Sequence, residues 1–276
     1  MTAQHYEGDY LLGSSDAEHE RLILQAIRLA PVTERFFREA GIGLGQRVLD
    51  VGSGVGDVAM LLTGLVGSSG EVVAIERDAR SINRARSRAS QRGLHNVTFV
   101  QTDIAQFSSD VSFDAAVGRF ILQFLPDPVA ALSFLSQRVR PGGVIAFQEQ
   151  SWAPFLALSR HLPLWSAAVF LLHEVSGRFG VNMEMGPALY KAFQDAGLPA
   201  PNMRLEMELG HEPDFTRWVS DAVYSVRPQI QKLNFSIEAL GDLETLRERL
   251  QSEVASSNTV VPWLAMVGAH CRTPPN

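Results

Sequence analysis

Three glycines at alternate positions, Gly52, Gly54 and Gly56, give the sequence its most specific chemical feature. They follow an apolar run, 48–51, in which Asp50 is the one acid. Glycine allows positive φ and lets a ligand lie against bare backbone, and the start of a helix presents free N–H groups. An apolar run, a glycine turn and then a helix-forming stretch therefore predict a small-molecule site rather than an ordinary tight turn.

Two acids further along the chain are expected to reach the same site. Glu76 ends the next apolar run, about twenty residues after the last glycine, where nucleotide-binding sheets place an acid on the ribose hydroxyls. Asp103 ends the third run and Gly118 the fourth. Ligands bind at the carboxyl ends of parallel strands, and a carboxylate accepts hydrogen bonds from a vicinal diol. For either acid alone, a loop cap on the surface is the alternative.

Alternating strands and helices must position these residues. An α/β fold with a parallel sheet covered on both faces follows from the short connections between them. Before the first strand, Ser15 and Glu18 fit a capping box, and Pro31 is expected to divide the segment into two helices. The predicted strands of the core are 47–51, 71–76, 96–103, 113–118 and 144–149, with helices between them.

The chain divides into four predicted parts. Residues 1–44 form an N-terminal helical cap, and residues 45–150 form the nucleotide-binding core. Residues 151–202 are rich in Trp, Phe, Leu and Met and are broken by Pro and Gly, which predicts a helical lid inserted between strands 5 and 6. Residues 203–276 return to the core sheet and its helices.

Five motifs, in order and at the usual spacing, resemble the class I S-adenosylmethionine-dependent methyltransferases, in particular small-molecule enzymes of bacterial specialised metabolism. The glycine spacing is one residue shorter than the dinucleotide fingerprint. The resemblance implies a Rossmann-like sheet of seven strands with the last strand antiparallel, and S-adenosyl-L-methionine as cofactor. The matching segments are 48–56, 73–76, 101–104, 113–117 and 139–143.

The resemblance also implies cofactor-binding roles. Asp50 would order the glycine loop or receive the amino group of the cofactor, and Glu76 would hold the ribose. Tyr10 belongs to an N-terminal segment that would close over the cofactor. The methionine part would lie along Gly52, Ser53, Gly54 and Gly56, with Gly118 and Arg119 near its end. The adenine would lie beside Arg77, Thr102, Asp103 and Ile104.

Methyl transfer is an in-line displacement, and a general base assists it where the acceptor must lose a proton. Glu149 and His173 are the predicted catalytic bases, and His211 is a weaker candidate. The aromatic lid favours a flat acceptor such as an indole, phenol or quinone, although the same residues also fit a plain helical core. The predicted substrate contacts are Tyr6, Trp152, His161, Trp165, Phe170 and Met185.

Composition restricts the partners and the setting. The net charge is −6, which argues against a nucleic-acid or anionic-membrane surface. The arginines of 80–92 lie on a predicted helix and are expected to form a solvated face. A single cysteine, Cys271, leaves no internal disulfide and no cysteine-built metal site, so no metal is expected. With no visible signal peptide and no apolar run of the ~20 residues that span a bilayer, we expect a cytoplasmic protein.

The sequence therefore predicts a methyltransferase that transfers a methyl group to a carbon, nitrogen or oxygen atom of a small aromatic or apolar metabolite. A base-modifying enzyme is disfavoured, because an Asn/Asp-Pro-Pro-aromatic motif does not follow the fourth strand. Two alternatives stay open: an NAD(P)-dependent oxidoreductase, disfavoured by the glycine spacing, and a cofactor-binding regulatory protein without transfer activity. The oligomeric state is also open, a homodimer included.

Overall fold

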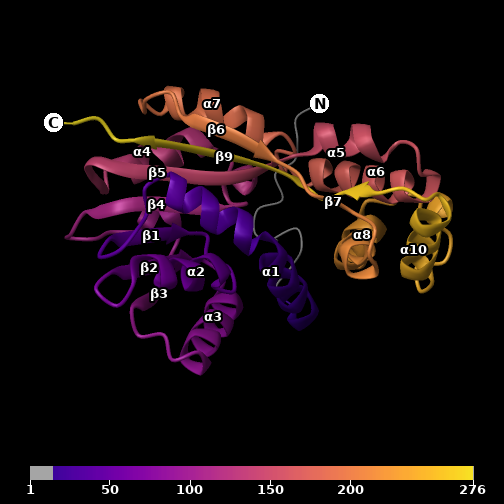
Figure 1. Cartoon of the computed structure of the whole chain (residues 1–276), viewed down its shortest axis with the longest axis horizontal. Coiled ribbons are helices and arrows are strands. Elements are labelled where there is room, and N and C mark those ends of the chain that lie inside the picture. The colour runs from indigo at the N-terminus through magenta and orange to yellow at the C-terminus, as the bar shows by residue number, and fades with distance from the viewer. Residues whose placement is uncertain (1–14, 276) are drawn as a thin grey trace. The chain divides into compact units, whose positions relative to one another are not determined.

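The computed structural model describes residues 15–275, and within them seven strands form one sheet (Figure 1). Their order is β3-β2-β1-β4-β5-β9-β6. Strands β1 to β5 pair in parallel, and the last strand, β9, is antiparallel, as predicted. The strands are β1 Arg47–Val51, β2 Glu71–Glu76, β3 Val97–Gln101, β4 Phe113–Arg119, β5 Val139–Ser151, β6 Asn202–Glu206 and β9 Ala265–Arg272.

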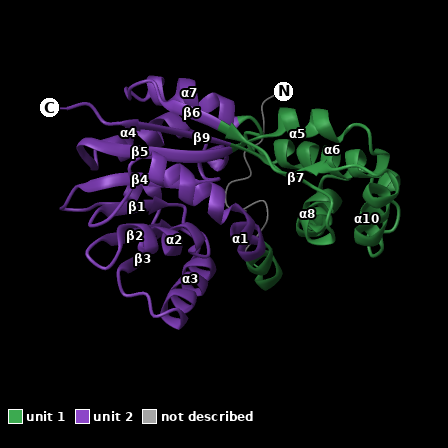
Figure 2. Cartoon of the chain, in the orientation of Figure 1, with its two compact units in different colours: residues 1–21, 150–184, 205–266 green, residues 22–149, 185–204, 267–276 purple. Residues whose placement is uncertain are grey.

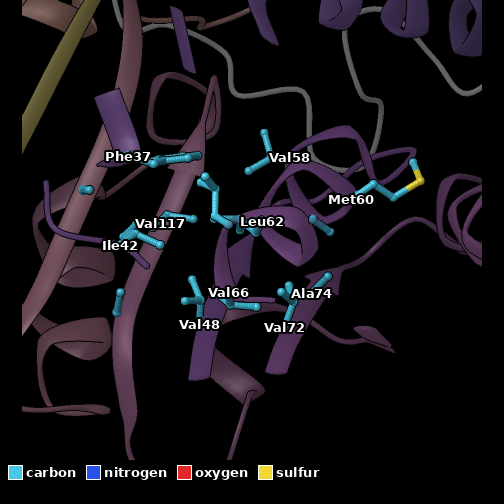
Figure 3. Close-up of a cluster of buried hydrophobic side chains, with 14 of the residues drawn as sticks. Phe37, Ile42, Val48, Val58, Met60, Leu62, Val66, Val72, Ala74 and Val117 are labelled. Carbon is cyan, nitrogen blue, oxygen red and sulfur yellow. The ribbon is translucent and has the colours of Figure 1, made fainter. Parts of the chain in front are cut away.

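Alternate residues of the central strands point into two hydrophobic clusters, one on each face of the sheet. Val48 packs with helices α2 and α3 and the end of α1, whereas its neighbour Leu49 packs with α4 and α7. Figure 3 shows part of the first cluster, in which Phe37, Leu62, Val66 and Val48 are among the labelled side chains. This two-residue period is why the strands are almost continuously apolar. The helices are α1 Asp16–Glu39, α2 Asp57–Val66, α3 Ala79–Gln91, α4 Pro128–Ser136 and α7 Met185–Asp195.

The helix before the first strand is one helix and not two. Pro31 lies inside α1, so the predicted interruption is wrong. Proline removes one backbone hydrogen bond from a helix, but Phe36 and Phe37 are buried in the core beyond it, and their packing stabilises the helix across that position. The predicted N-terminus is confirmed, since the N–H of Glu18 donates to Ser15 Oγ at 3.2 Å.

The chain forms two compact units, coloured separately in Figure 2. Unit 2 comprises 22–149, 185–204 and 267–276 and contains the sheet core. Unit 1 comprises 1–21, 150–184 and 205–266. Its elements include helices α5 Trp152–Ser159, α6 Pro163–Arg178, α8 Pro213–Ser225, α9 Arg227–Lys232 and α10 Leu246–Ser256, the 3₁₀ turn η3 Glu238–Leu240, and the antiparallel pair β7 Leu209–Gly210 and β8 Val261–Pro262.

These units differ from the predicted parts on both sides of the lid. Helix α7 was expected in the lid, but its Met185, Leu189 and Phe193 belong to the hydrophobic cluster on the sheet. Residues 205–266 were expected in the core, but they belong to unit 1. In the described residues, none of the helices combines the length and the apolarity that a membrane crossing requires.

Candidate functional site

The glycine turn after β1 has a left-handed backbone at all three glycines. Gly52, Gly54 and Gly56 have φ of 68°, 52° and 86°. The N–H groups of Gly52 and Ser53 donate to Ile75 O, which fixes the start of the turn to the end of β2. A Cβ on Gly54 would meet no atom within 4 Å, so this glycine presents bare backbone to open space. That is the surface a ligand needs.

A buried arginine holds the other end of the turn. Arg88 of α3 donates from Nη1 to Val55 O at 2.6 Å and from Nη2 to Asp57 Oδ1 at 2.6 Å. The expectation of a solvated arginine face is therefore wrong at this position, where the residue is 7% exposed. Because Asp57 opens α2, the ion pair joins the end of the glycine turn to two helices.

The side-chain oxygens of Asp50 and Ser53 are buried beside the turn. Among the residues that the structure describes, none accepts from or donates to either Asp50 oxygen or Ser53 Oγ. Burial raises the pKa of Asp50 to about 7. Arg119 opposes the shift and the charge of Glu76 adds to it, while the backbone N–H of Ala59, close to the carboxylate but without the geometry of a hydrogen bond, opposes it weakly. A buried carboxylate without hydrogen bonds is costly and requires an explanation, and a ligand that completes the site is one.

Arg119, at the end of β4, brings a positive charge to this carboxylate. Its Nη1 donates to Thr33 Oγ1 of α1 at 3.0 Å. Burial lowers the pKa of Arg119, while Asp57 and Asp50 oppose the shift. One guanidinium nitrogen is thus committed to the fold, and the group still has further donors for a ligand.

Glu76 ends β2 as predicted, and its carboxylate is fixed by backbone groups. Oε2 accepts from the N–H of Gly54 at 2.9 Å, and Oε1 accepts from the N–H of Asp78 at 2.9 Å. Each oxygen keeps a second lone pair for a ligand hydroxyl. The acid therefore also connects β2 to the glycine turn.

The residues expected at the adenine lie at the ends of β2 and β3. Arg77 and Asp103 are exposed, and Thr102 and Ile104 are half-buried. Asp103 accepts from the N–H of Ala105 at 2.9 Å and caps the 3₁₀ turn η1, Ile104–Gln106. Such a capping role is the alternative to ligand binding that the sequence left open for Asp103. The cap uses one carboxylate oxygen and leaves the other available to a ligand.

The segment after β4 contains a residue that sequence reasoning missed. Ile121 lies against both Gly52 and Gly118: a Cβ on Gly52 would be 2.6 Å from Ile121 Cδ1, and one on Gly118 would be 2.7 Å from Ile121 Cγ2. The register explains this, because Val51 pairs with Gly118 across β1 and β4. An isoleucine just after the fourth strand, facing two glycines, is the signal that could have identified it.

Glu149, a predicted base, is fully buried at 0% exposure. Its Oε1 accepts from the N–H groups of Ile121 at 3.0 Å and Leu122 at 2.8 Å, and its Oε2 accepts from that of Gln123 at 3.4 Å. Burial raises the pKa of Glu149 to about 8, and these hydrogen bonds oppose the shift. Both oxygens of the Glu149 side chain are therefore engaged by backbone N–H groups.

Most of the residues predicted to contact the acceptor lie in unit 1. Trp152 and Trp165 are buried, Phe170 is 38% exposed, and exposed His161 lies 3.2 Å from Thr259 Oγ1. The other predicted base, His173, is half-buried with its ring centroid 5.8 Å from that of Trp152. Trp152 also begins a row of aromatic rings that continues through Phe155, Trp218, Trp263 and Phe215.

Of four further predicted residues, the structure describes two. Met185 is buried in the cluster on the sheet of unit 2, as a core residue. His211 is exposed. Tyr6 and Tyr10 lie outside the described residues. The structure thus gathers the predicted cofactor residues, Tyr10 apart, at one edge of the sheet, whereas the predicted acceptor residues are divided between the two units.

Comparison with known proteins identifies a family for this chain. The family described as a methyltransferase domain matches residues 43–184. The ubiquinone/menaquinone biosynthesis C-methyltransferase UbiE of Coxiella burnetii is 34% identical over 119 residues, which cover 41% of this chain and 48% of that protein. Aklanonic acid methyltransferase DauC of Streptomyces sp. is 35% identical over 134 residues, covering 43% of this chain and 61% of that protein.

The chain spans about half the length of the UbiE protein and about three fifths of DauC. Two solved structures support the fold as a whole. YcgJ of Bacillus subtilis has a TM-score of 0.55 and 16% identity over 94% of this chain and 99% of its own. The [4+2]-cyclase SpnF has a TM-score of 0.54 and 17% identity over 90% of this chain and 81% of its own.

Proposed function

We propose, because this chain belongs to the methyltransferase-domain family, that it is an S-adenosylmethionine-dependent methyltransferase of a small molecule. The observation that carries the proposal is the buried carboxylate of Asp50 beside the glycine turn, without a hydrogen-bond partner among the described residues. A cationic group of a ligand would compensate this charge. A dinucleotide, with its anionic pyrophosphate, would not.

The residues of the turn fit the methionine end of S-adenosylmethionine. Asp50 and Ser53 supply oxygens that would accept from an ammonium group, and Arg119 supplies donors for a carboxylate. Gly54 presents open backbone beside them. The group to be held therefore carries both charges of an amino acid, and the remaining glycines of the predicted set, Gly52, Gly56 and Gly118, would shape the turn around it.

The adenosine part would lie along the ends of β2 and β3. The free lone pairs of Glu76 suit the ribose hydroxyls, and Asp103 keeps an oxygen for the adenine amino group. Thr102, Ile104 and the exposed Arg77 would flank the ring. We keep Tyr10 in the proposal as a contact of the N-terminal segment.

When bound, S-adenosylmethionine supplies a sulfonium methyl group as the electrophile. The acceptor we propose is a small aromatic or apolar molecule, methylated at carbon in the first instance, because UbiE is named as a C-methyltransferase. The aromatic row of unit 1 supports a flat, oxygen-bearing ring: the buried indole N–H groups of Trp152 and Trp218 find no acceptor in the described part of the chain. Within unit 1, His173 beside Trp152 remains our candidate base.

Calorimetry tests the cofactor. We expect the wild-type protein to bind S-adenosylmethionine and S-adenosylhomocysteine and not to bind NADPH, and Asp50→Asn to weaken binding by about tenfold or more. Binding of NADPH alone would overturn the proposal.

Transfer is tested separately, with methyl-labelled cofactor and a panel of phenols, quinones and indoles, followed by an extract of the producing cell. A protein that binds the cofactor and labels no compound in either would be a cofactor-binding regulator instead. A cytoplasmic location remains a prediction, and size-exclusion chromatography coupled to light scattering would measure the oligomeric state.

A further inference from the structure

The segment that follows β4 is held by a carboxylate from the neighbouring strand. The 3₁₀ turn η2, Leu122–Phe124, starts after Ile121, whose apolar side chain cannot cap it. Glu149 of β5 takes that role, accepting from the N–H groups of Ile121, Leu122 and Gln123. These are the donors that a helical turn leaves free at its start. A buried acid with three such bonds is built into the fold.

The geometry of the segment requires such an anchor. Phe120 has φ of 57°, a left-handed conformation that a side chain makes unfavourable, and its N–H donates to Gln148 O at 2.9 Å. The strained residue turns the chain so that Ile121 lies over Gly52 and Gly118. The hydrogen bonds to Glu149, together with the buried side chain of Leu122, offset the free-energy cost of the strained residue.

We propose that Glu149 is a positioning residue of the cofactor site: it fixes the turn at 120–124 and thereby holds the Ile121 side chain against the glycine turn. The inference rests on the proposed function, since it treats the Ile121 side chain as a wall of the cofactor site beside Gly52. It replaces the prediction that Glu149 is a general base.

Two observations favour positioning over proton transfer. A base must reach the proton of the acceptor, and the Glu149 side chain is fully buried. Both of its oxygens also accept from the backbone, with Oε1 occupied twice. Its oxygens therefore act on the turn and, through Ile121, on the ligand.

The experiment compares Glu149→Gln with Glu149→Met. The amide oxygen of glutamine can still accept from Ile121 and Leu122 and forfeits only the longest bond, 3.4 Å to Gln123. Methionine is similar in length but accepts none of them. Glu253→Met is the matched control, because Glu253 accepts from the N–H groups of Leu164 and Trp165 and caps helix α6 in unit 1.

The first readout is hydrogen exchange of the 121–123 amides in the cofactor-free protein, and the second is the calorimetric Kd of S-adenosylmethionine. We expect Glu149→Met to accelerate exchange at these amides and to weaken binding, each by about tenfold or more. Glu149→Gln should stay within about threefold of wild type in both, and Glu253→Met should change neither.

The results separate the inference from the proposed function. If the wild-type protein does not bind S-adenosylmethionine, the function fails, while the exchange data still report on the anchor. If Glu149→Met exchanges or binds as the wild type does, the anchor is refuted. Glu149→Gln can also show normal exchange and a normal Kd but no longer label any acceptor. That result would restore the prediction that Glu149 is a general base.

Ile121→Ala keeps the experiment decisive if Glu149→Met does not fold. It leaves the three hydrogen bonds in place, so the amides should remain protected, and removal of the wall should still weaken binding by about tenfold. Wild-type affinity in this variant would refute the proposal.

Discussion

At the scale of single residues, the charge of Asp50 should make the stability of the cofactor-free protein depend on pH. Burial raises its pKa from 3.8 to about 7 in the folded protein. Between these values the folded state binds more protons than the unfolded state, so the free energy of unfolding falls as the pH rises through this window. The loss can reach about 4 kcal/mol, at 1.36 kcal/mol for each pKa unit.

Asp50→Asn removes this dependence, because the amide does not ionise. We expect the variant to be more stable than the wild type at pH 8, by up to about 4 kcal/mol, and to differ little from it at pH 4. Urea unfolding at several pH values measures the difference. Glu149, with a pKa raised to about 8 by burial, acts in the same direction in both proteins, so only the difference between them reports on Asp50. Parallel curves for the two proteins would show that Asp50 is not the source.

Two glycines of the turn should respond differently to the same substitution. Gly54→Ala places a methyl group in open space, so its cost is that of a left-handed alanine, about 1 kcal/mol, while a bound cofactor would collide with the new group. Gly52→Ala adds a collision with Ile121 Cδ1 at 2.6 Å, about 1–3 kcal/mol more.

We therefore expect Gly54→Ala to keep most of its thermal stability and to lose cofactor affinity by about tenfold or more. Gly52→Ala should mainly lose thermal stability. Thermal melts and calorimetry on both variants check this. The assignment of the ligand to the Gly54 side would be wrong if Gly54→Ala bound the cofactor normally.

At the scale of elements, much of the fold could be predicted because its signals are local. The apolar runs around Val48, Val72 and Val117 and the glycine turn between them fix the order of strands and helices. The anchors could not be predicted, because each acts across a long separation. Helix α5 is an example, because its N-terminus is capped by Glu184 from a distant part of the sequence. The Glu184 carboxylate accepts from the N–H groups of Trp152 and Ala153, and the hydroxyl of Ser151, the N-cap residue, also donates to this carboxylate.

Among these anchors, Arg88 should determine how well the glycine turn is ordered. Arg88→Met keeps the apolar stem but loses the bonds to Val55 O and Asp57, leaving a carboxylate whose pKa burial already raises. We expect a loss of about 3–5 kcal/mol in stability, as for a broken buried ion pair, and weaker cofactor binding in the folded fraction.

Arg84→Met is the matched control on the same helix, at an exposed position. This substitution should change the free energy of unfolding by no more than about 0.5 kcal/mol. Urea unfolding and calorimetry measure both quantities, and equal losses in the two variants would mean that helix α3, not the ion pair, supports the turn.

At the scale of the molecule, the two compact units could not be predicted from sequence order, because contacts made by segments far apart in the chain define them. Helix α7 follows the lid segment directly, yet Leu189 and Phe193 pack on the sheet. Residues 205–266 join unit 1 although the strands β6 and β9 that flank them belong to the sheet. The candidate cofactor site was predictable because its motifs lie at successive strand ends. The acceptor site has no such pattern.

The placement of the tryptophans allows a test of how the units unfold. All four, Trp152, Trp165, Trp218 and Trp263, lie in unit 1, whereas the candidate cofactor residues that the structure describes lie in unit 2. Helix α1 and strands β6 and β9 continue from one unit into the other, so the loss of one unit removes part of an element in the second. We therefore expect one cooperative transition, in which tryptophan fluorescence and far-UV circular dichroism share a midpoint.

A bound ligand should shift this transition as a whole. S-adenosylhomocysteine at 100 times its Kd should add about 2.7 kcal/mol to the free energy of unfolding and move both midpoints equally, although it binds to the unit without tryptophan. A fluorescence midpoint that ignores the ligand while the dichroism midpoint rises would mean that unit 1 unfolds independently.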